Sequence, residues 1–337
     1  MGLRIAVVGP TATGKSDLAL DLAEHLAAAG HGAEIVNADA SQLYRGMDIG
    51  TAKVPLDQRR GVPHHQIDVL EVHQEANVAS YQRHARADLA AIEARGHVPI
   101  IVGGSGLYVR ALTDDIDFPG TDPRVRRALE ERARVQGLEA LRQELARRDP
   151  LAARRIEAGD ARRIVRALEV IEITGRPFSA GLPDYRDAAP TLHLALRPER
   201  QGLNARIDAR ARAMFDAGLL QEVEQLVGRG LREGSTAPRA IGYSQALEVL
   251  DGDLGYEEAI ARTVQATRTL ASRQIKWFRR DPRVHWIDTG TVPTRGAAPG
   301  GAAGREALGG AGAPPPREAA GRALGAALGL LEARLAD

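Results

Sequence analysis

The sequence predicts an α/β protein with a P-loop core, in which a parallel sheet is flanked by helices, and with a helical insertion domain. Three observations support this prediction. Short continuous apolar runs alternate with segments of helical periodicity, which is typical of parallel strands covered on both faces. A glycine-rich loop separates the first apolar run from the first helical segment. An arginine-rich helical segment then interrupts the alternation near the middle of the 337 residues.

The first half of the chain contains the clearest strand and helix patterns. Buried strands are predicted at 3–8, 33–39 and 98–104, and helices at Lys15 to about Ala29 and at 78–95. A glycine follows each helical segment, as is common where a helix ends. Because ligands bind at the carboxyl ends of parallel strands, we expect the functional site among the residues that follow these strands.

The second half of the chain is predominantly helical. The stretch from Arg124 to Arg166 contains 13 Arg against 7 Asp plus Glu. A strand is expected at 191–198, three or four helices at 199–278, and a last short strand at 284–288. From Gly290 to about Pro316, Gly, Ala and Pro dominate, which is typical of a disordered linker.

These patterns divide the chain into three parts, and the C-terminal part has no evident chemistry. The predicted parts are a P-loop core at 1–118 and 190–289, a helical insertion at 119–189, and a Gly/Ala/Pro-rich linker with a short C-terminal helix at 290–337.

Composition excludes several classes of protein. The chain has no cysteine, which excludes disulfides, iron–sulfur clusters and cysteine nucleophiles. The net charge of +1 argues neither for nor against nucleic acid as a partner. No apolar run approaches 18 residues, so we expect no membrane span and a cytoplasmic protein.

The stretch "GPTATGKS" matches the phosphate-binding pattern G-x-x-x-x-G-K-[ST] and lies between a predicted strand and a helix. Its backbone N–H groups and the helix N-terminus are expected to face an anion. The predicted phosphate ligands are Gly9, Pro10, Thr11, Ala12, Thr13, Gly14, Lys15 and Ser16. Lys15 is one of only three lysines, beside 42 arginines, and its slim ammonium suits a position between phosphate oxygens. The Ser16 hydroxyl is a candidate ligand for Mg²⁺.

The acid that ends a predicted strand is Asp39, in "IVNAD". A nucleotide hydrolase with this loop usually keeps an Asp at the end of a second apolar strand, but "VPIIVGGSG" ends in glycines and Ser105. We therefore expect Asp39 to face the loop, where it accepts a proton from a nucleophile or holds metal-bound water. An aspartate that only caps a turn is the structural alternative.

Eight stretches between residues 5 and 288 together resemble the tRNA dimethylallyltransferase family, in the order of that family. They are "GPTATGKS", "NADASQLYRGMDIGTAK", "GVPHHQID", "VGGSGLYVRAL", "DPRVR", "RRIVRALEV", "RAIGYSQ" and "TRTLASRQIKWFRRDPRVHWID". The residues after Gly290 lie outside the resemblance. Joint matches of this length are far more specific than a phosphate loop alone.

The resemblance implies a reaction and a set of roles. A dimethylallyl group passes from dimethylallyl diphosphate to N6 of the adenosine 3′ of the anticodon, in tRNAs that read U-initial codons, with Mg²⁺ as the usual metal. Lys15 and the loop would stabilise the diphosphate, Asp39 would be the general base, and Ser105 would lie near the bridging oxygen. The target base would be flipped out of the anticodon loop into a channel, where Gln42 would read it.

The resemblance also implies a tRNA-binding surface on which the 119–189 insertion holds the anticodon stem-loop, and it favours a monomer. Ala40, Ser41 and Ser244 differ from the residues that are usual in the family. The expected tRNA-binding residues are Asp39, Ala40, Ser41, Gln42, Ser105, Arg126, Arg162, Arg163, Arg166, Arg239, Gly242, Tyr243 and Ser244. A further basic run at 262–283 holds seven cations against one Asp. In a chain with 42 arginines, a solvated helix face is the alternative explanation for each basic stretch.

Three other functions remain open at this stage. They are a P-loop small-molecule kinase, a prenyltransferase that accepts free AMP, and an RNA-binding protein without catalysis. His64 and His65 are expected to be structural, because no carboxylate–histidine cluster lies near them in the sequence. Trp277 and Trp286 are expected in the core.

Overall fold

The computed structural model describes residues 2–116, 118–181, 185–289 and 317–336. Its centre is one six-stranded parallel sheet with the strand order β3-β2-β4-β1-β5-β6. The strands are β1 (Arg4–Val8), β2 (Ala33–Asn37), β3 (His64–His65), β4 (Val98–Gly103), β5 (Thr191–Arg197) and β6 (Val284–Asp288). This confirms the predicted fold class, and five of the strands lie where apolar runs predicted them.

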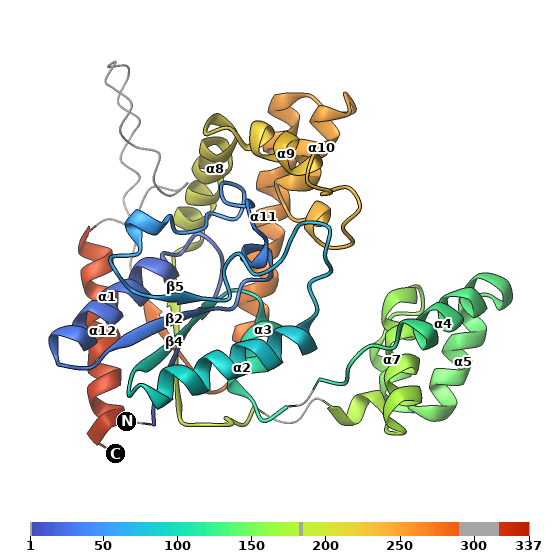
Figure 1. Cartoon of the computed structure of the whole chain (residues 1–337), viewed down its shortest axis with the longest axis horizontal. Coiled ribbons are helices and arrows are strands. Elements are labelled where there is room, and N and C mark those ends of the chain that lie inside the picture. The colour runs from blue at the N-terminus through green and yellow to red at the C-terminus, as the bar shows by residue number, and fades with distance from the viewer. Residues whose placement is uncertain (1, 117, 182–184, 290–316, 337) are drawn as a thin grey trace.

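Helices cover both faces of this sheet (Figure 1). Alternate strand residues point to opposite faces, so Val7 packs under α1 while Val8 packs on the side of α2 and α3. The core helices are α1 (Lys15–Ala28), α2 (Val78–Ala94), α3 (Gly106–Thr113), α8 (Arg200–Asp216), α9 (Leu219–Val227), α10 (Tyr243–Leu250), α11 (Tyr256–Phe278) and α12 (Arg317–Ala336). Short 3₁₀ turns lie at Ala40–Leu43, Leu56–Gln58, Phe178–Gly181 and Ala237–Arg239.

Four helices between β4 and β5 bury apolar side chains among themselves. They are α4 (Pro123–Gln136), α5 (Leu138–Arg148), α6 (Pro150–Arg155) and α7 (Ala161–Thr174). Leu129, Leu141 and Leu168 are at most 2 % exposed in this separate cluster. Figure 1 shows these helices set apart from the sheet and joined to it by two neighbouring chain segments.

A buried network of charges holds those two segments together at the edge of the core. Asp114 and Asp187 form an isolated antiparallel bridge between the outgoing and returning chain. Arg283 donates to Asp114 at 2.8 Å, to Asp187 at 2.7 Å and to Asp281 at 2.7 Å. Asp114 is fully buried and also pairs with Arg110, and the network anchors the base of the insertion to the residues just before β6.

The C-terminal helix α12 packs against the core rather than standing apart from it. Ala323, Ala327 and Leu331 join the apolar cluster under α1, and α12 also contacts β5 and β6. The linker expected at 290–316 lies outside the described residues. Among the described residues, no helix has the length and apolar character that a membrane crossing requires.

The docking of α12 predicts different outcomes for two neighbouring alanines. Ala327 is fully buried against α1 and Ala326 is exposed. Ala327→Asp places a carboxylate in an apolar contact and should lower the thermal midpoint by at least about 4 °C. Ala326→Asp is the matched control and should leave the midpoint unchanged. Calorimetry of both variants checks this, and equal midpoints would show that α12 does not dock.

Candidate active site

The glycine-rich loop wraps around a cavity of about 470 Å³ at the carboxyl ends of β1, β2 and β4. Gly9, Ala12 and Gly14 all have positive φ, at 119°, 60° and 87°, which turns the loop back on itself before α1 begins. The Thr13 hydroxyl donates to the Pro10 carbonyl at 2.9 Å and closes the loop. The N-terminus of α1 and the loop amides thus border this cavity, as an anion site requires, and the binding of phosphate there stays a prediction.

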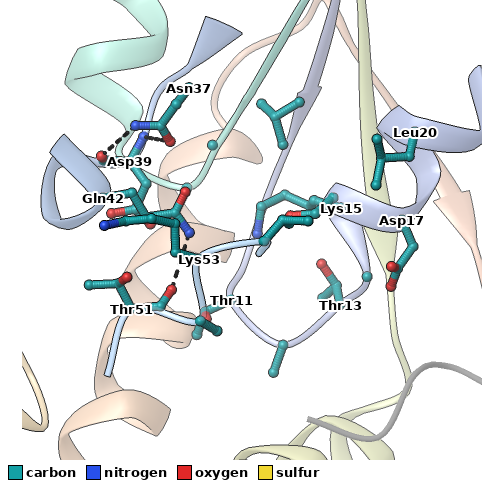
Figure 2. Close-up of a pocket in the computed structure, with 18 of the residues that line it drawn as sticks. Thr11, Thr13, Lys15, Asp17, Leu20, Asn37, Asp39, Gln42, Thr51 and Lys53 are labelled. Carbon is teal, nitrogen blue, oxygen red and sulfur yellow. Dashed lines mark hydrogen bonds between the residues drawn. The ribbon is translucent and has the colours of Figure 1, made fainter. Parts of the chain in front are cut away.

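Lys15 reaches from the first turn of α1 into this cavity, where Figure 2 shows it on the side opposite Asp39. Its Nζ donates to the Pro10 carbonyl at 2.6 Å. Burial lowers the pKa of the Lys15 ammonium to about 8, against the opposing effect of Asp39 and with a smaller contribution from Arg210. An anion in the cavity would restore the charge of this ammonium. Ser16 and Asp17 follow Lys15 in the wall of the same cavity.

Asp39 lies two residues beyond β2 and faces the phosphate loop across the cavity. Its Oδ1 accepts from the Ser41 amide at 3.0 Å and caps the turn that follows. Asn37 holds the backbone on both sides, because its Oδ1 accepts from the Asp39 amide and its Nδ2 donates to the Asp39 carbonyl, both at 3.0 Å. Within the described residues, Asp39 Oδ2 has no hydrogen-bond donor. Asp39 is thus both a turn cap and a carboxylate in the cavity wall.

Two arginines of α8 belong to the cavity although the sequence did not single them out. Arg206 Nε donates to the carbonyl of Ala12 at the crest of the phosphate loop, at 2.9 Å. Burial lowers the pKa of Arg210, and Asp39 acts in the opposite direction. Among the described residues, Arg210 has no hydrogen bond or ion pair. Arg206 and Arg210 are four residues apart and therefore lie on one helix face. In a chain with 42 arginines, this spacing does not distinguish them from other arginines.

Lys53 also lines this cavity, but its charge is satisfied within the protein. Its Nζ donates to Asp48, to Asp68 at 2.6 Å and to the Tyr44 carbonyl at 2.9 Å. These three acceptors use the full donor capacity of an ammonium group. Lys53 therefore organises the segment after β2 and does not compete with Lys15 for an anion.

A second cavity of about 430 Å³ begins at Asp39 and extends away from the phosphate loop. Ser105 lies in its wall, and the Ser105 hydroxyl accepts from the Ala40 amide at 3.3 Å. Its remaining wall is largely apolar, with Met214 and Leu270 among the lining residues. Asp39 thus stands where a phosphate-binding cavity meets a more apolar one.

Trp277 lines this second cavity, and the expectation that it belongs to the core is wrong. Its side chain is 36 % exposed on α11, because only one side of the indole packs, against the turn at Gly106. Trp286 is half-buried on β6 against the apolar cluster that includes Phe278, with the Arg197 guanidinium 5.5 Å from its ring centre.

A groove of about 990 Å³ lies between the core and the insertion, and it shares Ser41, Arg239 and Ala240 with the second cavity. Arg126, Arg162, Arg166 and Arg239 line it, together with Ala40 and Ser41. Two of these arginines also have internal partners. Arg126 binds the buried Glu169 at 2.9 Å, and Arg166 donates to Glu169 at 2.8 Å.

Two predicted arginines on α7 are exposed. Arg162 lies in the wall of the groove. The side chain of Arg163 is 70 % exposed, and its Nε lies 3.2 Å from Asp160.

The stretch 239–244 differs from the expected contact surface in one respect. Tyr243 is fully buried, and its hydroxyl donates to Glu222. Glu222 in turn accepts from the backbone amides of Asp48 and Ile49 at 3.1 and 2.8 Å. The Tyr243 side chain therefore holds the segment after β2 and is not available to RNA. Gly242, with φ of 91°, and the half-buried Ser244 begin α10 beside it.

Gln42, His64 and His65 each form hydrogen bonds within the protein. Gln42 Nε2 donates to the Thr51 carbonyl at 3.1 Å, and its side chain lines the phosphate cavity. His65 hydrogen-bonds Glu34 at 2.6 Å, and His64 hydrogen-bonds the Val62 carbonyl at 2.8 Å. Within the described ranges, no group of three or more His, Cys, Asp or Glu could hold a metal ion. The structural role expected for these histidines stays a prediction.

These features define a P-loop α/β protein in which a loop-lined cavity lies beside a carboxylate and near a groove rich in arginine. The chain belongs to the IPP transferase family, whose model matches residues 42–281.

Curated relatives carry the same family identity. A tRNA dimethylallyltransferase of Thermobifida fusca (strain YX) is 58% identical over 287 residues, which cover 85% of this chain and 90% of that protein. Another of Streptomyces coelicolor is 54% identical over 288 residues, covering 86% and 91%.

Solved structures share the fold. The full-length tRNA isopentenylpyrophosphate transferase of Bacillus halodurans is 36% identical, with a TM-score of 0.62 over 86% of this chain and 90% of that one. A eukaryotic dimethylallyltransferase acting on tRNA is 27% identical, with a TM-score of 0.72 over 86% and 74%.

The lowered pKa of Lys15 predicts how anion affinity depends on pH. A bound diphosphate favours the ammonium form, so affinity should be full below about pH 8 and fall by up to about tenfold per unit above it. Calorimetric titration with inorganic diphosphate between pH 7 and 9.5 measures this. Diphosphate itself also ionises in this pH range. The Lys15→Met variant, which lacks the ammonium, is measured in parallel as the control for that effect. A constant ratio of the two affinities across this range would contradict the role of Lys15.

Proposed function

We propose that this chain transfers a dimethylallyl group from dimethylallyl diphosphate to N6 of the adenosine 3′ of the anticodon, in tRNAs that read U-initial codons. The observation that carries the proposal is the position of Asp39. It stands between the anion-binding loop and a second cavity that leads to the groove of the insertion. A diphosphate donor and a base acceptor can thus approach it from opposite sides.

The phosphate cavity supplies what the leaving group needs. When the allylic C–O bond breaks, its electron pair goes to the diphosphate, whose negative charge must be stabilised. Lys15, the Arg210 guanidinium and the loop amides face that position. These donors are held by the fold before the reaction, so they need no reorganisation as charge develops.

The donor set of the cavity fits Mg²⁺. The hydroxyl of Ser16 lines it beside the carboxylates of Asp17 and Asp39, and within the described residues no group of three or more His, Cys, Asp or Glu could hold a metal ion. Mg²⁺ typically takes one or two protein ligands together with substrate phosphates and several waters. Ser16 would hold it, and the bound ion would supply further neutralisation of the diphosphate.

The acceptor side needs a base, because N6 loses a proton as it attacks carbon. As the new C–N bond forms, Asp39 Oδ2 accepts that proton. The capped Oδ1 keeps the carboxylate oriented during this transfer. Ser105 lines the second cavity and Gln42 lines the phosphate cavity, so both are proposed to act where the two cavities meet at Asp39, Ser105 near the bridging oxygen and Gln42 on the base.

The groove between the core and the insertion would receive the anticodon stem-loop. Its arginines offer cations to phosphates, and the target base would leave the stack to reach the second cavity. The proposed contacts are Arg126, Arg162, Arg166 and Arg239, which line the groove, and the exposed Arg163 beside them on α7, and Glu169 also holds Arg126 and Arg166. A monomer in the cytoplasm is the proposed working form.

Asp39→Asn tests the base. The amide keeps an oxygen that can cap the turn but cannot accept the proton, so kcat should fall by at least about 100-fold. Binding of an anticodon stem-loop should stay within about threefold. Transfer of labelled dimethylallyl groups to the stem-loop measures the first, and fluorescence anisotropy the second. The exposed Asp57→Asn is the control. A loss of binding without a loss of kcat would make Asp39 a recognition residue.

Arg163→Ala tests the RNA contact. Removing one phosphate contact should weaken stem-loop binding by about 3–10-fold and reduce the slope of log affinity against log salt by about 1. Arg134→Ala removes an arginine of similar exposure, 74 % against 70 %, that is paired with Glu131 on α4. Equal affinities and salt slopes for the two variants would rule out the contact.

A further inference from the structure

Gln274 of α11 connects two loops of the site that are far apart in sequence. Its Oε1 accepts from the Thr11 amide in the phosphate loop at 2.8 Å. Its Nε2 donates to the Gly104 carbonyl, just after β4, at 3.0 Å. The side chain is 7 % exposed, so both hydrogen bonds are shielded from water. Neither bond is local, since they span 263 and 170 residues of chain.

The turn after β4 is shaped to receive this side chain. A Cβ on Gly104 would lie 2.3 Å from Gln274 Nε2 and 3.1 Å from the Gly9 carbonyl oxygen. A Cβ on Gly106 would lie 2.0 Å from Trp277 Nε1. Gln274 and Trp277 are three residues apart on one face of α11. The two glycines therefore permit a close approach that any larger residue would prevent.

The connection reaches the reacting groups on both sides. Thr11 belongs to the loop that carries Lys15, and Gly104 precedes Ser105, whose hydroxyl accepts from the Ala40 amide. Ala40 is the neighbour of Asp39. A single side chain thus lies between the diphosphate-binding half of the site and the half that holds the base.

We propose that Gln274 is a positioning residue that sets the separation between the phosphate loop and the Ser105–Asp39 side of the site. In this role, which rests on the proposed function, Gln274 acts through the two loops that it joins. The amide is required because it is at once a donor and an acceptor. A carboxylate lacks the donor, methionine lacks both groups, and asparagine is one methylene shorter.

The effect of Gln274 should appear in turnover rather than in binding. Each loop can still bind its own ligand without the connection, but the reacting atoms are no longer held at the productive separation. A displacement of about 1 Å at a reacting centre can cost about 100-fold in rate. Neither donor affinity nor RNA affinity depends directly on the separation.

Gln274→Met keeps the length of the side chain and removes both hydrogen bonds. We expect kcat for transfer to a stem-loop to fall by about 10–100-fold, with KM for dimethylallyl diphosphate and stem-loop Kd within about threefold. Gln265→Met, at an exposed position of the same helix, is the matched control. A kcat within twofold of the unmodified chain, or a loss confined to KM, would overturn the proposal.

Gln274→Glu keeps the test decisive if the methionine variant does not fold. The ionised carboxylate cannot donate to Gly104, whereas the protonated form can make both bonds. Burial favours the protonated form of the introduced carboxyl group. The kcat of the Gln274→Glu variant, divided by the kcat of the unmodified chain, should therefore be below one and should rise as pH falls from 8 to 6. Lys15, Asp39 and Arg210 are present in both proteins, so the pH dependence that these groups give to kcat cancels in this ratio. A ratio of one throughout would overturn the proposal.

The failure of this inference is distinct from that of the proposed function. If the unmodified chain does not label the stem-loop, the proposed function fails, whatever the variants do. If it labels the stem-loop and the Gln274 variants do so at the same kcat, only the positioning role fails. Titration with inorganic diphosphate shows in either case whether the phosphate loop itself is intact.

Discussion

The site depends on the close approach of three turns at the carboxyl edge of one parallel sheet. β1 lies between β4 and β5, so the phosphate loop that follows it emerges beside the end of β4. The end of β2 reaches β4 from the other side, and a Cβ on Gly103 would lie 2.2 Å from the Ala38 carbonyl oxygen. Only glycine permits this contact. The phosphate loop and Asp39 consequently face each other across the cavity at the ends of these strands.

Around this edge, helices from later in the chain complete the site. α8 supplies Arg206 and Arg210 to the phosphate loop, and α11 supplies Gln274 and Trp277 to the turn after β4. The insertion joins the same core through the buried network at Arg283. The wall of the cavity is thus assembled from segments separated by up to 263 residues, which makes it sensitive to the packing of the whole core.

The sequence predicted the sheet well because its strands are continuous apolar runs bounded by glycine or polar residues, as at 98–104. It also predicted Lys15 and Asp39, because both are local to a strand end. Arg210 and Gln274 were missed, since their roles arise only from tertiary packing and neither stands out by type. Tyr243 was wrongly predicted to contact RNA, because a family motif marks its position but not the direction of its side chain, which is buried. The two-residue strand β3 was too short to give a pattern.

In the proposed reaction, the phosphate loop binds the diphosphate of an isoprenoid donor, and the acceptor is RNA. This reaction is tested most directly by incubating the protein with Mg²⁺, labelled dimethylallyl diphosphate and ATP, together with an anticodon stem-loop and AMP in equal amounts. We expect one labelled dimethylallyl group in the RNA for each diphosphate released, no label in AMP and no consumption of ATP. Label in AMP, or ATP consumed without any prenyl transfer, would contradict the proposed reaction and assign the loop to another substrate.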